Sequence, residues 1–97
     1  MVSFQEIATQ LAPKAKSYKN FKIGKSGQTA KERFDQEHCK TYASYGELGF
    51  SDTASTIDQC EQFLIDYFKS YPNNDNKQGS AGEMTNSNRY IVYIVWN

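Results

Sequence analysis

Residues 52–71 read DTASTIDQCEQFLIDYFKSY and contain the clearest helical pattern in the chain. Apolar side chains recur there every three or four residues, a spacing that places them on one face of a helix. These positions are Ile57, Cys60, Phe63, Leu64, Tyr67, Phe68 and Tyr71. Because the residue before a proline disfavours helical dihedral angles, the helix should end before Pro72. We expect it to be the main core helix.

Glu61 interrupts the apolar face of this predicted helix. At about 100° per residue it falls between Ile57 and Ile65, whereas the other polar residues fall outside the apolar arc. A buried carboxylate destabilises a fold unless it is paired or bound to a cation. We therefore expect Glu61 to form an ion pair with an Arg or Lys, to bind a metal ion, or to lie at the mouth of a cleft.

An N-terminal helix is predicted over residues 1–12. Ser3 and Glu6 have the spacing of a capping box, in which two side chains satisfy the first amide groups of a helix. Apolar residues follow at helical spacing until Pro13, which lacks the amide hydrogen of an interior helix residue. Residues 13–20 are lysine-rich and irregular.

Two strands are predicted, one near each end of the chain. Residues 21–23, FKI, alternate apolar and basic side chains, as expected of a strand with one buried face, and Gly24 and Gly27 mark a turn. Residues 90–96, YIVYIVW, are rich in β-branched and aromatic side chains and predict a buried strand. Residues 42–51 contain two glycines and hold one short strand or none.

Residues 72–88 form a long polar loop without periodicity, and loops of this length are usually functional or disordered. Together the elements predict an α+β fold with a small antiparallel sheet of about three strands flanked by helices. At 97 residues and 11.1 kDa, the chain has the size of one domain, covering residues 1–97.

The composition predicts a soluble, cytoplasmic protein that spans no membrane. No apolar run at the N-terminus is long enough for a signal peptide. The longest apolar run, residues 90–96, has seven residues, whereas a membrane span needs about twenty. Cys39 and Cys60 are therefore expected as reduced thiols. Even with His38 they do not supply the ligand set of a structural zinc site.

Charges are distributed unevenly along the chain. Eleven Lys and Arg residues balance eleven Asp and Glu residues, so the net charge is zero. Residues 13–33 nevertheless contain seven cations against one acid, a local net charge of plus six. The cations are Lys14, Lys16, Lys19, Lys22, Lys25, Lys31 and Arg33. This segment is interpreted as a phosphate-contacting surface, or alternatively as a solvated edge that discourages strand aggregation.

A second helix is predicted from Thr29 to about Lys40, capped by Ser26 or Thr29. Its apolar face is thin. Phe34 should face inward, so that the neighbouring Arg33 reaches towards the end of the preceding strand. Because a planar guanidinium can bind a phosphate through two hydrogen bonds, Arg33 is a candidate phosphate ligand.

Several of these residues, taken together, resemble the GIY-YIG endonuclease superfamily. The residues that carry the resemblance are FKIGKS at 21–26, Arg33-Phe34, His38, Glu61, Asn76-Lys77 with Gly79 and Gly82, and the closing strand at 90–95. Each motif is short, and their order and spacing carry most of the resemblance. It covers about residues 21–95 and implies a fold of the GIY-YIG type.

The resemblance implies a divalent-metal-dependent endonuclease that hydrolyses phosphodiester bonds in DNA. Glu61 would bind Mg²⁺ or Mn²⁺, and Arg33 would stabilise charge on the phosphate. His38 and Tyr42 would orient water or phosphate, and Asn76 would match the asparagine of the family's final loop. Contacts with DNA would come from Lys19, Lys22, Lys25, Ser26, Lys31 and Tyr42. A protein partner would be a further source of specificity.

Two departures from the family's pattern leave the general base open. The family's first strand, Gly-Ile-Tyr, is missing before residue 21, and Lys22 stands where the second motif has its tyrosine. The base would be Lys22 with a lowered pKa, Tyr18, or Tyr93 if the last strand packs where the first normally lies. The missing tyrosines also suit a catalytically inactive domain that binds nucleic acid or a protein. A third alternative is an unrelated interaction domain in which Glu61 pairs with Arg33.

Overall fold

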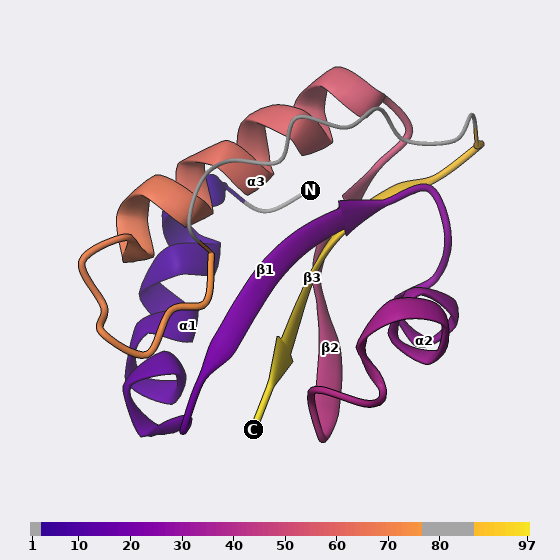
Figure 1. Cartoon of the computed structure of the whole chain (residues 1–97). Coiled ribbons are helices and arrows are strands. Elements are labelled where there is room, and N and C mark those ends of the chain that lie inside the picture. Colours follow the sequence, from indigo (N-terminus) through magenta and orange to yellow (C-terminus); the bar gives the residue numbers. More distant parts are fainter. Residues whose placement is uncertain (1–2, 77–86) are drawn as a thin grey trace.

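The computed structural model describes residues 3–76 and 87–97, which form an α+β fold (Figure 1). Its elements are α1 (Phe4–Ser17), β1 (Phe21–Ser26), α2 (Ala30–Arg33), the π-helical turn η1 (Phe34–His38), β2 (Ser44–Ser51), α3 (Ala54–Phe68) and β3 (Tyr90–Trp96). The strands form a three-stranded antiparallel sheet in the order β1-β3-β2. The predicted class, a small antiparallel sheet flanked by helices, is confirmed.

The last strand, β3, lies in the centre of the sheet and is buried on both faces. The β3 side chains that point towards the core of α1 and α3 are Tyr90, Val92 and Ile94. A second core includes residues of α2 and η1. The β3 side chains that point towards it are Ile91, Tyr93 and Val95. Figure 1 shows α1 and α3 on one face of the sheet and α2 on the other. Because both faces are covered, the strand is a continuous apolar run, and the predicted buried strand is confirmed.

α3 is the main core helix, as its periodicity predicts. Its completely buried side chains are Ile57, Cys60, Leu64 and Phe68. Tyr67 is 39% exposed, so the buried arc is narrower than the apolar pattern. The helix ends at Phe68, before Pro72. No helix within residues 3–76 and 87–97 has both the length and the apolar character needed to cross a membrane.

α1 continues through Pro13 to Ser17, so the predicted boundary at residue 12 was wrong. A proline inside a helix removes one backbone hydrogen bond and costs about 3 kcal/mol. Ala15, in the additional turn, is completely buried in the core. Tyr18 follows the helix and stacks on Trp96 with ring centroids 4.9 Å apart. Packing of the last turn therefore outweighs the local cost of the proline.

Both edge strands are longer than the local sequence suggests. β1 continues through Gly24 to Ser26, so the turn expected to begin at Gly24 was wrong. The pairing of Gly24 with Tyr93 of β3 extends the strand. β2 occupies eight residues of the segment that the sequence left open, with an irregular register between Glu47 and Gly49. Both strands are stabilised by backbone pairing with the buried β3, which a local propensity does not reveal.

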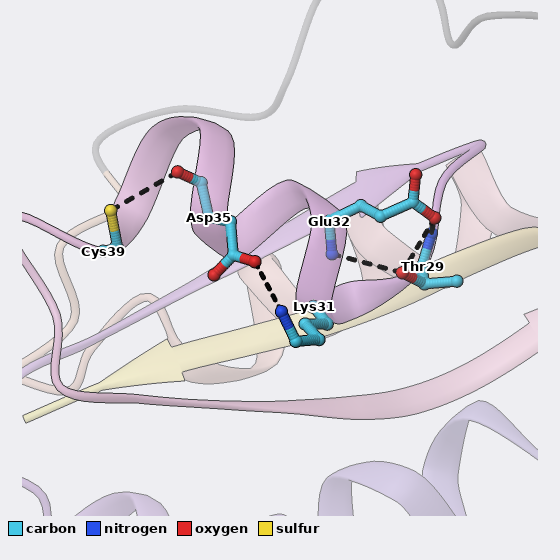
Figure 2. A network of polar contacts seen from close by, with 5 residues as sticks. All are labelled: Thr29, Lys31, Glu32, Asp35 and Cys39. Carbon is cyan, nitrogen blue, oxygen red and sulfur yellow. Dashed lines mark hydrogen bonds and ion pairs between the residues drawn. The ribbon is translucent and has the colours of Figure 1, made fainter.

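α2 begins with a capping box. The Thr29 hydroxyl accepts the Glu32 amide at 3.1 Å, and the Glu32 carboxylate accepts the Thr29 amide at 3.4 Å (Figure 2). Thr29, and not Ser26, is therefore the N-cap of this helix. The helix then widens into η1, which ends at His38.

Residues 73–76 of the predicted polar loop run along the outer edge of β1. The Phe21 amide donates to the Asn73 carbonyl at 3.0 Å, and the Phe21 carbonyl accepts the Asp75 amide at 2.8 Å. These contacts cover the start of an edge that would otherwise be open to pairing. Residues 77–86 of the loop lie outside the part of the chain that the structure describes.

Candidate functional site

The candidate site is built around Tyr93 at the centre of the sheet. Tyr93 pairs with Gly24 of β1, and its phenol ring lies against the Gly24 backbone. A Cβ atom at Gly24 would lie 2.5 Å from both Cζ and Oη of Tyr93. Such a contact leaves no room for any side chain, so glycine at this position is what lets the phenol lie over β1.

His38, the last residue of η1, contacts the Tyr93 hydroxyl. His38 Nε2 lies 2.9 Å from Tyr93 Oη, and the imidazole is buried. Burial lowers the pKa of His38; of the nearby charges, Glu37 raises it, whereas Lys22 and Arg33 lower it further. The imidazole is therefore neutral near neutral pH. In the tautomer that leaves Nε2 unprotonated, it accepts the hydrogen bond of the phenol.

Arg33, at the end of α2, places positive charge beside Tyr93. Its Nη2 forms an ion pair with Glu37 Oε1 at 2.7 Å. Its Nε is buried and has no hydrogen-bond partner among the described residues. Burial raises the pKa of Tyr93, and the Arg33 guanidinium opposes this shift. The phenol is therefore neutral at physiological pH, with a cation placed to stabilise negative charge next to it.

Glu61 is buried in α3, as its position on the apolar face predicts, with 2% of its surface exposed. Lys25 Nζ lies 3.9 Å from Glu61 Oε1, but makes its shorter contact, 2.7 Å, with Asp58 Oδ1. The expected ion pair between Glu61 and Arg33 is wrong, because Arg33 pairs with Glu37 and the cation near Glu61 is Lys25. Burial raises the pKa of Glu61 to about 7, with Lys25 opposing the shift. Near neutral pH, the carboxyl is therefore poised between its two protonation states.

Glu61 and Tyr93 approach β1 from opposite faces. Gly24 and Lys25 are consecutive strand residues, so their side-chain directions differ: Gly24 faces Tyr93, and Lys25 faces Glu61. The charge of Glu61 nevertheless contributes to the raised pKa of Tyr93. The two halves of the site are therefore within electrostatic range of each other across β1.

The donor atoms available to a divalent ion are few. Within residues 3–76 and 87–97, no group of three or more His, Cys, Asp or Glu side chains is placed to hold a metal ion. Mg²⁺ is often bound through one or two carboxylates and completes its shell with water and substrate phosphates. Glu61, the carboxylate expected to serve in that mode, is 2% exposed and has Lys25 Nζ 3.9 Å from its Oε1.

Asn76 lies at the outer edge of β1, where the backbone uses its side chain. Its Oδ1 accepts the Ile23 amide at 2.8 Å, and its Nδ2 donates to the Ile23 carbonyl at 2.9 Å. Both polar ends of the side chain are therefore engaged in extending the edge of the sheet. Lys77, Gly79 and Gly82, which accompany Asn76 in the predicted motif, lie outside the described residues.

Three of the seven cations in residues 13–33 are held in ion pairs. They are Lys25, Lys31 and Arg33. Figure 2 shows Lys31 with Asp35, whose atoms Nζ and Oδ2 are 2.7 Å apart. Lys19 and Lys22 are exposed and form no ion pair with the residues that the structure describes. The basic surface predicted for the whole segment is therefore partly neutralised.

Ser26 and Tyr42 both make contacts within the fold. The buried Ser26 hydroxyl accepts the Gln28 amide at 2.9 Å in the turn before α2. The Tyr42 hydroxyl donates to Asp75 Oδ2 at 2.6 Å, and burial together with this bond raises the pKa of Tyr42. The Tyr42 ring also meets the His38 ring edge-on, with centroids 6.0 Å apart. Tyr42 is thus placed to position His38.

The sequence alone does not identify Tyr93 as the central residue of the site. Nothing in YIVYIVW distinguishes Tyr93 from Tyr90, and Tyr93 stood as one of three alternatives for the base. The distinguishing signal is the glycine opposite it, which becomes visible only when the register of β1 against β3 is known. The sequence also did not single out Glu37, which forms an ion pair with Arg33, or Asp75, which accepts the hydrogen bond of Tyr42. Asp75 reaches Tyr42 only through the tertiary fold.

No protein-family model matches the sequence, and no curated protein and no solved structure matches the chain.

Proposed function

We propose that this protein is a divalent-metal-dependent endonuclease of the GIY-YIG type that hydrolyses phosphodiester bonds in DNA. The observation that carries the proposal is the 2.9 Å contact between Tyr93 Oη and His38 Nε2 beside Arg33. Phosphodiester hydrolysis needs a group that takes a proton from water and a cation that neutralises the phosphate. This cluster contains both kinds of group, and the buried carboxylate of Glu61 lies on the opposite face of β1.

Tyr93 is the general base in this proposal. The chain lacks the family's first strand, and β3 is the strand that pairs with β1, so β3 would take its place and Tyr93 that of its tyrosine. Tyr93 would accept a proton from water while its own proton passes to the neutral His38. The products are hydroxide, which attacks phosphorus, and an imidazolium. The same relay can return the proton to the leaving oxygen.

Arg33 and Glu61 supply the remaining roles. Arg33 would exchange its ion pair with Glu37 for two hydrogen bonds to the phosphate. Glu61 would hold Mg²⁺ or Mn²⁺ as its single protein ligand. When bound, the ion would neutralise charge on the phosphate and on the leaving oxygen. The exposed Lys22, on the Gly24 face of β1, would contact the DNA backbone.

A second candidate function is binding of nucleic acid or a protein without catalysis. Two observations favour it: the ion pair with Glu37 occupies the Arg33 guanidinium, and burial raises the pKa of Tyr93. The carboxylate of Glu37 neutralises the guanidinium, and the phenol of Tyr93 resists ionisation. Both effects would slow catalysis, but neither would weaken a binding surface.

Plasmid cleavage in Mg²⁺, with EDTA as the blank, tests the proposal. Arg33→Ala, Tyr93→Phe and Glu61→Gln should each lower the cleavage rate about a hundredfold or more. Arg89→Ala and Tyr67→Phe are matched controls, since Arg89 pairs with Glu47 and Tyr67 is 39% exposed on α3. These controls should cleave at the rate of the unmodified protein.

The two candidate functions give different results in this experiment. Metal-dependent cleavage that survives in all three site variants would contradict the proposed site. Salt-sensitive DNA retention without cleavage would favour the binding function. A chain that neither cleaves nor retains DNA at low salt would contradict the nuclease and the nucleic-acid-binding function together.

A further inference from the structure

A concave surface lies near the start of β1, beside the C-terminal ends of α1 and α3. It is a groove of about 510 Å³, within the size range of ligand sites. The groove is lined by Lys16, Tyr18, Ser70, Tyr71, Pro72 and Asn73. None of these residues belongs to the site around Tyr93.

The two tyrosines of the groove are held in place by the core. The Tyr18 ring stacks on Trp96, with centroids 4.9 Å apart and planes at 11°. The Tyr71 ring packs edge-on against Phe21 and Phe68, with centroids at 6.3 Å and 5.0 Å. Rings that are already ordered lose little conformational freedom when a planar ligand stacks on them.

The charge around the groove is positive. Lys16 lines it, and Lys19 lies three residues further along the chain, next to the groove residue Tyr18. Within the described part of the chain these lysines form no ion pair, and no Asp or Glu lines the groove. An anionic ligand is therefore favoured over a neutral or cationic one.

The C-terminal ends of α1 and α3 disfavour an anionic ligand, but two asparagines reduce this effect. The C-terminal end of a helix carries about half a negative charge on its unpaired carbonyls. Asn73 Nδ2 donates to the carbonyls of Ala15 and Tyr18 at 2.7 Å and 2.9 Å, and Asn74 Nδ2 donates to Phe68 at 3.0 Å. With these carbonyls engaged, the full charges of the lysines dominate.

We infer that this groove binds an unpaired nucleotide of single-stranded nucleic acid. Tyr18 and Tyr71 stack on the base, and Lys16 contacts the phosphate. A planar apolar group joined to an anion is the ligand that ordered aromatic rings and lysines recognise together. The inference rests on the proposed function for the class of its ligand, but it uses no residue of the Tyr93 site.

Trp96 provides the measurement, since it is the only tryptophan of the chain and stacks on Tyr18. Titrating the full chain with a short oligothymidylate in EDTA should quench Trp96 fluorescence, and the apparent affinity should fall as salt is added. Lys16→Gln and Tyr18→Leu should each weaken binding, Tyr18→Leu by about tenfold. Tyr18→Phe keeps the ring and should bind as the unmodified protein does.

Arg89→Gln is the matched control for charge, because it also removes one cation but lies at the far end of β3, outside the groove. Its affinity should stay within about twofold of the unmodified protein. Labelled-oligonucleotide anisotropy measures the affinity where a variant alters Trp96 emission, and circular dichroism shows whether each variant is folded. Folded Lys16→Gln and Tyr18→Leu variants that bind like the unmodified chain would overturn the inference.

Two further results would also overturn it. One is the absence of quenching at low salt. The other is equal quenching and full competition by polyglutamate, which would identify an acidic polypeptide as the occupant. Failure of the nuclease proposal is separable, because this titration needs no metal and no cleavage. Arg33→Ala and Tyr93→Phe should keep the quenching even where they abolish cleavage.

Discussion

The phenol ring of Tyr93 lies over the backbone of Gly24, its partner across β1 and β3. The missing side chain at Gly24 gives the ring the space it occupies, and the ring carries Oη to within 2.9 Å of His38 Nε2. A glycine near the beginning of the chain thus determines where a tyrosine near its end can deliver a hydroxyl group.

Gly24→Ala should destabilise the protein by roughly 1–3 kcal/mol, because the new Cβ would overlap the Tyr93 ring and force the ring or the strand to move. Urea denaturation measures the loss. Gly46→Ala in β2 is the matched control, since its Cβ would meet its nearest atom, in the Trp96 ring, at 3.5 Å. Similar losses in the two variants would argue against the close contact. Adding Tyr93→Ala to Gly24→Ala should remove the clash and give a non-additive result.

Glu61→Gln should stabilise the protein at alkaline pH. Burial raises the pKa of Glu61 from 4.5 to about 7, so the folded state binds the proton more tightly than the unfolded state. The contribution of this group to the free energy of unfolding is complete below about pH 4.5 and is lost as the pH rises through about 7. The loss amounts to roughly 3 kcal/mol, and a neutral amide avoids most of it.

Urea denaturation at acid and alkaline pH checks this prediction. Glu47→Gln is the control, because Glu47 forms an exposed pair with Arg89 and should show a small effect at both values. A Glu61→Gln variant that is less stable than the parent at alkaline pH would mean that attraction to Lys25 outweighs the cost of burial.

His38 should titrate below its ordinary pKa of 6.5. It is the only histidine of the chain, so its ring resonances can be followed by NMR without assignment of others. Lys22→Gln should raise the pKa of His38 and Glu37→Gln should lower it, whereas Lys31→Gln should leave it unchanged. The stability that a neutral His38 contributes is present above about pH 6.5 and is lost as the pH falls through the folded pKa. An unshifted pKa would contradict the buried contact with Tyr93.

Asn76→Ala should cost about 1–2 kcal/mol of stability, because two hydrogen bonds to Ile23 are lost at the edge of β1. The Ile23 amide should then exchange with deuterium faster than in the parent protein. Asn88→Ala, at an exposed position before β3, is the control. Unchanged protection of Ile23 in Asn76→Ala would show that this side chain does not secure the strand edge.

Helical periodicity predicted α3 and the burial of Glu61, because a fixed angle per residue links sequence position to helix face. Local signals failed where packing opposed them. Pro13 should have ended α1, yet the burial of Ala15 keeps the helix intact to Ser17. A glycine at position 24 predicts the beginning of a turn, but pairing with β3 makes Gly24 part of a strand.

The sequence by itself therefore determined the α+β class, the main core helix, the buried last strand and the unusual place of Glu61. Each of these depends on the order of apolar and polar residues within one element. Only the tertiary structure decided that Tyr93 contacts His38 with Arg33 nearby, and that Lys25, not Arg33, reaches Glu61. These side-chain contacts depend on the pairing register of distant strands and on helix packing, which local periodicity does not encode.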